Sequence, residues 1–128
     1  MSRREAALLW DLIASVDAIT GFVGESSLDA YLNDPLLRAA VERHLITIGE
    51  VFVRLGPDSD LAGRLDAPVR QVIGMRNTIV HGYDLIDDAV IYRTATGSLA
   101  PLRAAAAREL DALDPGGSAA SPEDLRAL

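Results

Sequence analysis

The chain has 128 residues, no cysteine and a formal net charge of -7. This length is typical of one domain with its own core, and the lack of thiols excludes disulfides and thiolate metal sites. The acidic balance argues against a protein that coats nucleic acid, but all 12 basic residues are arginines, which leaves room for a local basic pocket. Asp11 and Asp17 make the N-terminal segment unlike a secretion signal or a membrane span, so we expect a cytoplasmic protein that does not bind membranes.

The first third of the chain predicts one long and one short helix. Apolar residues at spacings of three and four predict a helix over about residues 2–23, which a following glycine ends. Ser26 or Ser27 then caps a short helix that ends by Asn33, because a serine hydroxyl accepts a hydrogen bond from a free backbone N–H.

The dipeptide Asp34-Pro35 predicts the start of another long helix, since a capping carboxylate precedes a proline in the first turn. The helix runs to about Leu55, where Gly56 and Pro57 stop it. Besides its apolar face it has a polar line, formed by Arg43, Thr47, Glu50 and Arg54. Because both faces carry a distinct pattern, we expect this helix to lie between its own bundle and a second copy of the chain.

The middle of the chain predicts a loop and a helix. Residues 56–63 are rich in proline, aspartate, serine and glycine, and therefore predict a loop. Asp66 is the predicted cap of the next helix, which has Pro68 in its first turn and ends at His81-Gly82.

The last helical region begins after a turn, with Asp87 or Asp88 as its cap. Residues 94–98 are poor helix formers, so a break or kink is expected there, with Pro101 in the first turn of the piece that resumes. Together these elements predict an all-α domain.

Composition divides the chain into two parts. Residues 1–113 hold the predicted helices and form the helical domain. Residues 114–128 begin with an Asp-Pro-Gly-Gly-Ser stretch and are predicted to be a flexible C-terminal tail.

Residues 76–83, with the sequence RNTIVHGY, bring an arginine, an amide, an imidazole and a phenol within about two helical turns. The apolar stripe of this helix passes through Arg76, and a guanidinium at such a position requires an anion, solvent or a ligand. On an ideal helix Arg76 and His81 point about 140° apart. They meet at one phosphate only if the helix unwinds after Val80, for which Gly82 in a left-handed conformation is suited, or if two copies of the chain face each other.

This string is similar to the Arg-(four residues)-His-any-Tyr motif of the HepT family of HEPN-domain proteins. The similarity extends to residues 73–75 and 48–50 and covers roughly Leu9 to Leu113. It implies a HEPN-type up-and-down bundle of four main helices, assembled as a homodimer in which two copies of the motif line one cleft.

The resemblance implies the toxin of a HEPN/MNT toxin–antitoxin system, a ribonuclease that cuts RNA rather than DNA by 2'-hydroxyl attack, without metal or cofactor. Arg76 and His81 are the expected catalytic residues: the guanidinium stabilises negative charge, and the imidazole moves protons near neutral pH. Asn77 is expected to have a supporting role, orienting His81 or capping backbone groups. The implied partner is an MntA-like nucleotidyltransferase antitoxin that inactivates the enzyme by attaching AMP to Tyr83, where the added anion would occupy the phosphate site.

Other interpretations stay open. The chain is alternatively a non-catalytic nucleotide- or partner-binding subunit of a nucleotidyltransferase complex, which the acidic composition favours slightly. Arg76 is alternatively a structural ion-pair partner of a carboxylate such as Glu50. His44 lies beside apolar residues and is expected to be buried or at an interface, and the two histidines show no metal-binding spacing.

Overall fold

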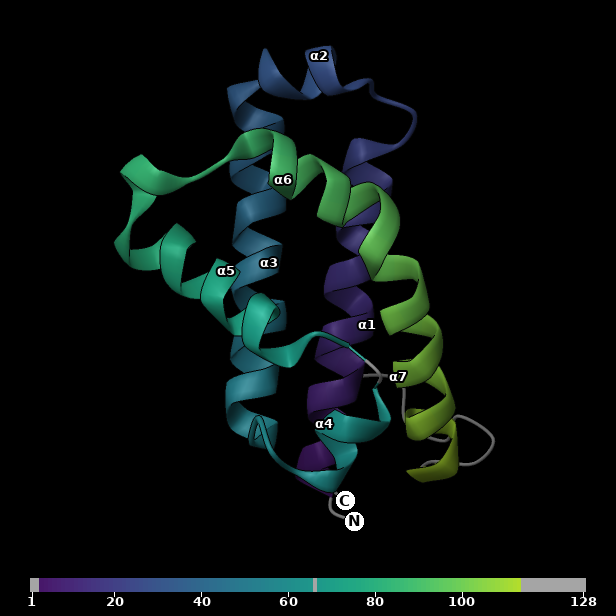
Figure 1. The fold of residues 1–128 in the computed structure, drawn as a ribbon. Coiled ribbons are helices and arrows are strands. Elements are labelled where there is room, and N and C mark those ends of the chain that lie inside the picture. Colours follow the sequence, from purple (N-terminus) through teal and green to yellow (C-terminus); the bar gives the residue numbers. More distant parts are fainter. Residues whose placement is uncertain (1–2, 66, 114–128) are drawn as a thin grey trace.

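The computed structural model describes residues 3–65 and 67–113, and its secondary structure is entirely helical there. The order is α1 (Arg3–Val23), α2 (Leu28–Leu32), α3 (Pro35–Leu55), α4 (Asp60–Arg64), α5 (Val69–His81), the 3-10 helix η1 (Tyr83–Leu85), α6 (Asp88–Arg93), the π-helical segment η2 (Thr94–Ser98) and α7 (Leu99–Leu113) (Figure 1). The predicted all-α class is confirmed for this part of the chain. The predicted tail of residues 114–128 lies outside it.

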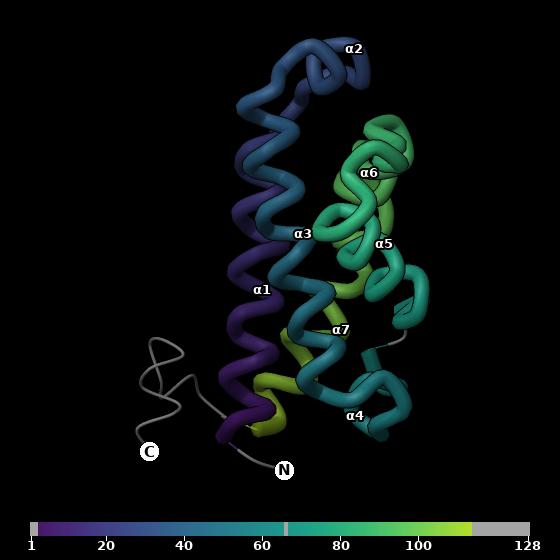
Figure 2. The backbone as a smooth tube through the Cα atoms, turned by 90° about the vertical axis from the view of Figure 1, so that its left-hand side faces the viewer, coloured from purple at the N-terminus to yellow at the C-terminus, as the bar shows by residue number. Residues whose placement is uncertain are grey.

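The helices are arranged in two layers. The two longest, α1 and α3, lie side by side and antiparallel, and α2 joins them at one end (Figures 1 and 2). Figure 2 shows α5 and α6 stacked on one side of this pair. Contacts of α5 with α3 and of α7 with α1 close the core. The four main helices of the bundle are therefore α1, α3, α5 and the continuous run from α6 to α7.

Local sequence signals account for the limits of α3. The Asp34 carboxylate accepts a hydrogen bond from the backbone N–H of Leu37 (3.0 Å), and Pro35 occupies the first turn. At the other end Gly56 takes a φ of 92°, which few residues other than glycine adopt, and stops the helix after Leu55. Both predicted limits of this helix are confirmed.

The short helices are capped in the same way. Ser27 caps α2 and Asp87 caps α6 through their side-chain oxygens, as predicted. The prediction of an unbroken loop over residues 56–63 is wrong, because Ser59 accepts a hydrogen bond from Ala62 N–H (3.1 Å) and starts α4 there. Composition indicated a loop, whereas a single serine cap and buried apolar residues produce one helical turn.

Two expectations concern the flanks of α5 and α6. The predicted cap Asp66 lies outside the described residues, and α5 begins directly after Pro68 with no side-chain cap within the described segment. The regular α-helix is interrupted at residues 94–98, as predicted, but by the π-helical segment η2 and not by a loop, and Pro101 lies in the first turn of α7 as predicted. There Thr94 and Thr96 donate hydrogen bonds to carbonyl oxygens four residues earlier (3.0 and 2.9 Å), a pattern that often bends helices.

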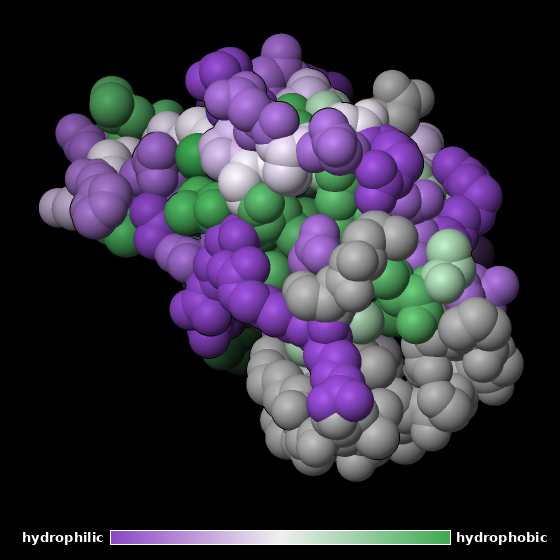
Figure 3. All heavy atoms as spheres, turned by 90° about the horizontal axis from the view of Figure 1, so that it is seen from below, coloured by the Kyte–Doolittle hydropathy of each residue, from purple (hydrophilic) through white to green (hydrophobic). Residues whose placement is uncertain are grey.

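By length and composition alone, α1 is apolar enough to cross a membrane, but half of its most apolar stretch is buried inside the fold. It packs against α3 and α7, and its core residues are Leu9, Leu12, Val16 and Ile19. These contacts account for its apolar composition. Viewed from below, the surface of the described residues shows patches of hydrophobic residues between hydrophilic ones (Figure 3).

Candidate active site around Arg76

Arg76 lies where α5 crosses α3, directly over Gly49. A Cβ atom added to Gly49 would lie 2.3 Å from Cβ and 2.7 Å from Cγ of Arg76. Real Cβ atoms do not approach other heavy atoms so closely, so the two helices touch at this point only because position 49 has no side chain. The close approach holds the stem of Arg76 in the helix interface.

The guanidinium group of Arg76 is bound on two sides. Its Nη2 donates to the Glu50 carboxylate, and its Nη1 donates to Asn77 Oδ1 at 2.9 Å. Its Nε is buried and has no hydrogen-bond partner among the described residues. The side chain is 21% exposed. The two contacts use one hydrogen each and leave the second hydrogen of Nη1 and of Nη2 for another acceptor.

Glu50 is the carboxylate partner that sequence reasoning named as an alternative for Arg76, and the structure confirms this ion pair. Glu50 also lies 3.9 Å from Arg54 Nε, one helical turn further along α3. One carboxylate thus lies between two guanidinium groups, so the cluster of three side chains carries one net positive charge. The polar line of α3 contains Glu50 and Arg54, but the sequence alone does not show that Arg54 lies near the partner of Arg76.

His81 leaves α5 in a direction different from that of Arg76. The helix does not unwind after Val80, as one alternative required, but continues through His81. Gly82 has a φ of -125°, outside the left-handed region, and its N–H donates to Thr78 O at 2.8 Å. Regular helix geometry therefore keeps Arg76 and His81 about 140° apart. By this geometry the two side chains leave α5 on different sides within one chain.

The remaining motif residues lie near the surface. His81 is exposed in the last turn of α5. Tyr83 follows in η1 and is 80% exposed. Asn77 contacts Arg76 directly, so its orienting contact is with the guanidinium. The motif thus presents a fixed cation on one side of α5, and an imidazole and a phenol at its C-terminal end.

His44 is partly buried between α1 and α3. Its Nδ1 lies 3.3 Å from Ser15 Oγ, and its ring packs 5.7 Å from that of Phe22, measured between centroids. Burial, together with the nearby charge of Arg43, lowers the pKa of His44. These contacts support the predicted packing role.

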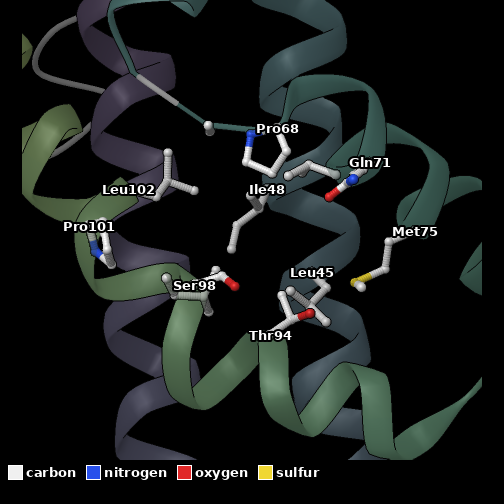
Figure 4. A pocket seen from close by; sticks show the side chains of 12 residues that line it. Leu45, Ile48, Pro68, Gln71, Met75, Thr94, Ser98, Pro101 and Leu102 are labelled. Atoms are coloured by element: carbon white, nitrogen blue, oxygen red, sulfur yellow. The ribbon is translucent and has the colours of Figure 1, made fainter.

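A cavity of about 110 Å³ lies apart from the motif, between α3, α5 and the η2–α7 segment (Figure 4). Leu45 and Ile48 face it from α3, and Leu102 faces it from α7. The described residues that line it include no titratable side chain, so the cavity offers no acid–base chemistry. Within the described residues, no group of three or more histidine, cysteine, aspartate or glutamate side chains is placed to bind a metal ion.

The all-helical secondary structure of the described residues, with Arg76 and His81 on one helix, is consistent with a HEPN-type helical domain. The family model "Ribonuclease HepT-like" matches residues 12–109, and the chain belongs to this family. The match includes the whole of the motif at residues 76–83.

Two curated relatives also have names that refer to ribonucleases. "Putative RNase MJ1380" of Methanocaldococcus jannaschii is 27% identical over 95 residues, which cover 73% of this chain and 85% of the relative. "Putative RNase MJ0125" of the same organism is 27% identical over 89 residues, covering 70% of this chain and 76% of the relative. No solved structure matches the chain significantly.

Proposed function

We propose that this protein is the ribonuclease toxin of a HEPN/MNT toxin–antitoxin system, acting in the cytoplasm without a metal ion. The observation that carries the proposal is the seating of Arg76, a mostly buried guanidinium with donors left free on Nη1 and Nη2. These N–H groups can donate hydrogen bonds to the oxygen atoms of a phosphate. Membership of the HepT-like ribonuclease family supports the same substrate class.

The proposed reaction is attack of a ribose 2'-oxygen on the adjacent phosphorus. The P–O bond to the 5'-oxygen of the next nucleotide breaks, which leaves a 2',3'-cyclic phosphate and a 5'-hydroxyl. His81 accepts the proton of the 2'-hydroxyl, and a second imidazole protonates the leaving oxygen. Arg76 stabilises the negative charge that grows on the phosphate oxygens.

A homodimer supplies the second imidazole. Because Arg76 and His81 diverge on α5, we propose that two chains face each other so that Arg76 of one chain and His81 of the other share a phosphate. Val53 and Val80 support this face: each lies one helical turn beyond a contact residue, Gly49 and Arg76 respectively, and they are 46% and 39% exposed. Exposed apolar side chains that lie together can mark a surface that a second subunit covers.

The Arg76–Glu50 ion pair favours a second candidate function. Because Glu50 already binds the guanidinium, the attraction of Arg76 for phosphate is reduced. The ion pair alone can also account for an arginine at this position, as a structural contact between α3 and α5. The ion pair thus favours a chain without catalytic activity, and the second candidate is a non-catalytic nucleotide- or partner-binding subunit of a nucleotidyltransferase complex, which the net charge of -7 also favours. This candidate predicts binding without cleavage.

Cleavage of a labelled single-stranded RNA by the purified protein separates the two candidates. In EDTA the wild-type protein is expected to produce fragments that end in 2',3'-cyclic phosphate, identified by mass spectrometry. His81→Ala is expected to lower the rate by about 10²- to 10⁴-fold, the usual contribution of a general acid or base. RNA or nucleotide binding with no cleavage by the wild-type protein would contradict the ribonuclease and support the binding subunit.

We further propose that Tyr83 is the point of inactivation by an MntA-like nucleotidyltransferase antitoxin. Its phenol is 80% exposed and lies directly after α5, where a second enzyme can reach it. The phenolic oxygen would attack the α-phosphate of ATP, lose its proton and release pyrophosphate, leaving AMP on the ring.

Mass spectrometry of the protein co-expressed with its nucleotidyltransferase tests this modification. The expected result is an AMP adduct on Tyr83 and loss of ribonuclease activity. Tyr83→Phe keeps the ring but removes the nucleophile, so it should stay unmodified and remain active in the presence of the antitoxin. An adduct at another residue, or an unmodified Tyr83, would refute the proposed switch.

A further inference from the structure

A charged groove runs between α1 and α3, on residues that the motif does not include. It consists of two adjoining hollows of about 250 and 430 Å³, which share Asp11, Arg43 and Thr47. The first hollow is also lined by Leu8, Glu50, Val51 and Arg54, and the second by Ala14, Ser15 and His44. We call this feature the α1–α3 groove.

Positive charge prevails along the α1–α3 groove, although the whole chain is acidic. Arg43 and Arg54 line it. Two carboxylates, Asp11 and Glu50, also line it. Arg76 binds Glu50, so with Arg76 three guanidinium groups lie beside two carboxylates in a protein with a formal net charge of -7. An anion that approaches this protein is attracted to this region.

The two lining arginines have donors available. Arg43 Nη1 donates to Thr47 Oγ1 at 3.0 Å, and Arg43 forms no ion pair with any described residue. The Arg54 side chain is 64% exposed, and its Nε is 3.9 Å from Glu50, a separation longer than a hydrogen bond. Both guanidinium groups can therefore bind a phosphate without first breaking a short internal bond.

The α1–α3 groove is continuous with the candidate active site through Glu50. This residue lines the groove and at the same time binds Arg76 of α5. At 1.5 Å per residue, Arg43 and Arg54 are about 16 Å apart along α3, with Glu50 between them. A chain of phosphates that passes Arg76 can extend along α3 past both arginines.

We propose that the α1–α3 groove binds the sugar–phosphate backbone of the RNA beside the scissile phosphate, with Arg43 and Arg54 each contacting one phosphate. The proposal rests on the ribonuclease function proposed above and extends it from one phosphate to a strand. Contacts to the backbone carry no base information, so this subsite confers affinity and register rather than sequence preference. The ligand is single-stranded RNA, because a single flexible strand can follow one groove.

Salt-dependent binding of a single-stranded RNA oligonucleotide tests the subsite. The measurements use the full chain carrying His81→Ala, so that the RNA stays intact, and add Arg43→Gln, Arg54→Gln or both. Each single change is expected to weaken binding. The logarithm of the association constant falls with the logarithm of the salt concentration, and each change should make this slope less steep by about 0.7, the value for one phosphate contact on a single strand. The double change is expected to reduce it by about twice as much.

Arg93→Gln is the matched control, since it removes the same charge from an exposed position on α6, in the other layer of the molecule (Figure 2). It should leave the slope unchanged. Thermal unfolding followed by circular dichroism verifies that each variant is folded. In the active protein, Arg43→Gln should raise KM at least several-fold while kcat stays near the wild-type value.

The outcomes distinguish this proposal from the one on which it rests. If RNA binds but Arg43→Gln and Arg54→Gln leave the slope unchanged, the groove is not an RNA subsite. The same holds if Arg93→Gln makes the slope less steep by an equal amount. Neither result contradicts the proposed ribonuclease activity. If the groove variants reduce the slope but the wild-type protein does not cleave RNA, the groove binds RNA and the catalytic proposal fails. Absence of RNA binding by the His81→Ala protein would overturn the subsite.

Discussion

Replacing Arg76 with alanine is expected to lower kcat for RNA cleavage by about 10²- to 10³-fold, which corresponds to about 2.7–4 kcal/mol of transition-state stabilisation. The guanidinium is the charge that Glu50 and Asn77 hold in place at the helix crossing. Arg76→Lys keeps the positive charge but has no planar fork that can bind Glu50, Asn77 and phosphate together, so an intermediate rate is expected. Single-turnover cleavage of labelled RNA measures both variants.

Arg93→Ala is the control for the loss of an arginine, because Arg93 is exposed on α6 and should leave the rate unchanged. Arg76→Ala should remain folded, since Glu50 is 34% exposed and keeps Arg54 within 3.9 Å. A folded Arg76→Ala protein with wild-type kcat would contradict the catalytic assignment. That result would indicate that Arg76 has a structural role, through its ion pair with Glu50.

Gly49→Ala is expected to destabilise the protein by about 1–3 kcal/mol, the usual cost of placing extra atoms into a packed interface. The new Cβ would lie 2.3 Å from Arg76 Cβ, and both atoms are attached to helical backbone that cannot rotate away. The helices α3 and α5 must therefore separate. Since Arg76 moves with α5, cleavage should fall together with stability. Urea unfolding measures the first effect and the RNA assay the second.

Gly74→Ala provides a matched control for this substitution. Gly74 lies within α5, and an added Cβ would meet nothing within 4 Å. Alanine there should stabilise the helix by about 0.5–1 kcal/mol, because glycine loses more backbone entropy on folding. If Gly49→Ala were as stable as wild type, α3 and α5 could not be in the close contact described.

How much the sequence predicts depends on how local the interaction is. Ser27, Asp34 and Asp87 cap helices through backbone atoms two or three residues away, so the starts of α2, α3 and α6 could be derived from spacing alone. The short helix α4 was not predicted, because residues 56–63 have the composition of a loop and only Ser59, which caps the helix, indicates a helix start. The interruption between α6 and α7 could be predicted from the weak helix formers at residues 94–98, but its π-helical form could not.

The sequence by itself determined the family, through the residue types and spacing of the motif at residues 76–83. Only the tertiary structure decided what surrounds Arg76: which glycine it packs on, which carboxylate holds it, and that Gly82 leaves His81 turned away. The physical reason is that residue spacing specifies angles around one helix. Distances between atoms of α3 and α5 depend instead on how closely the two helices pack, to which the whole core contributes.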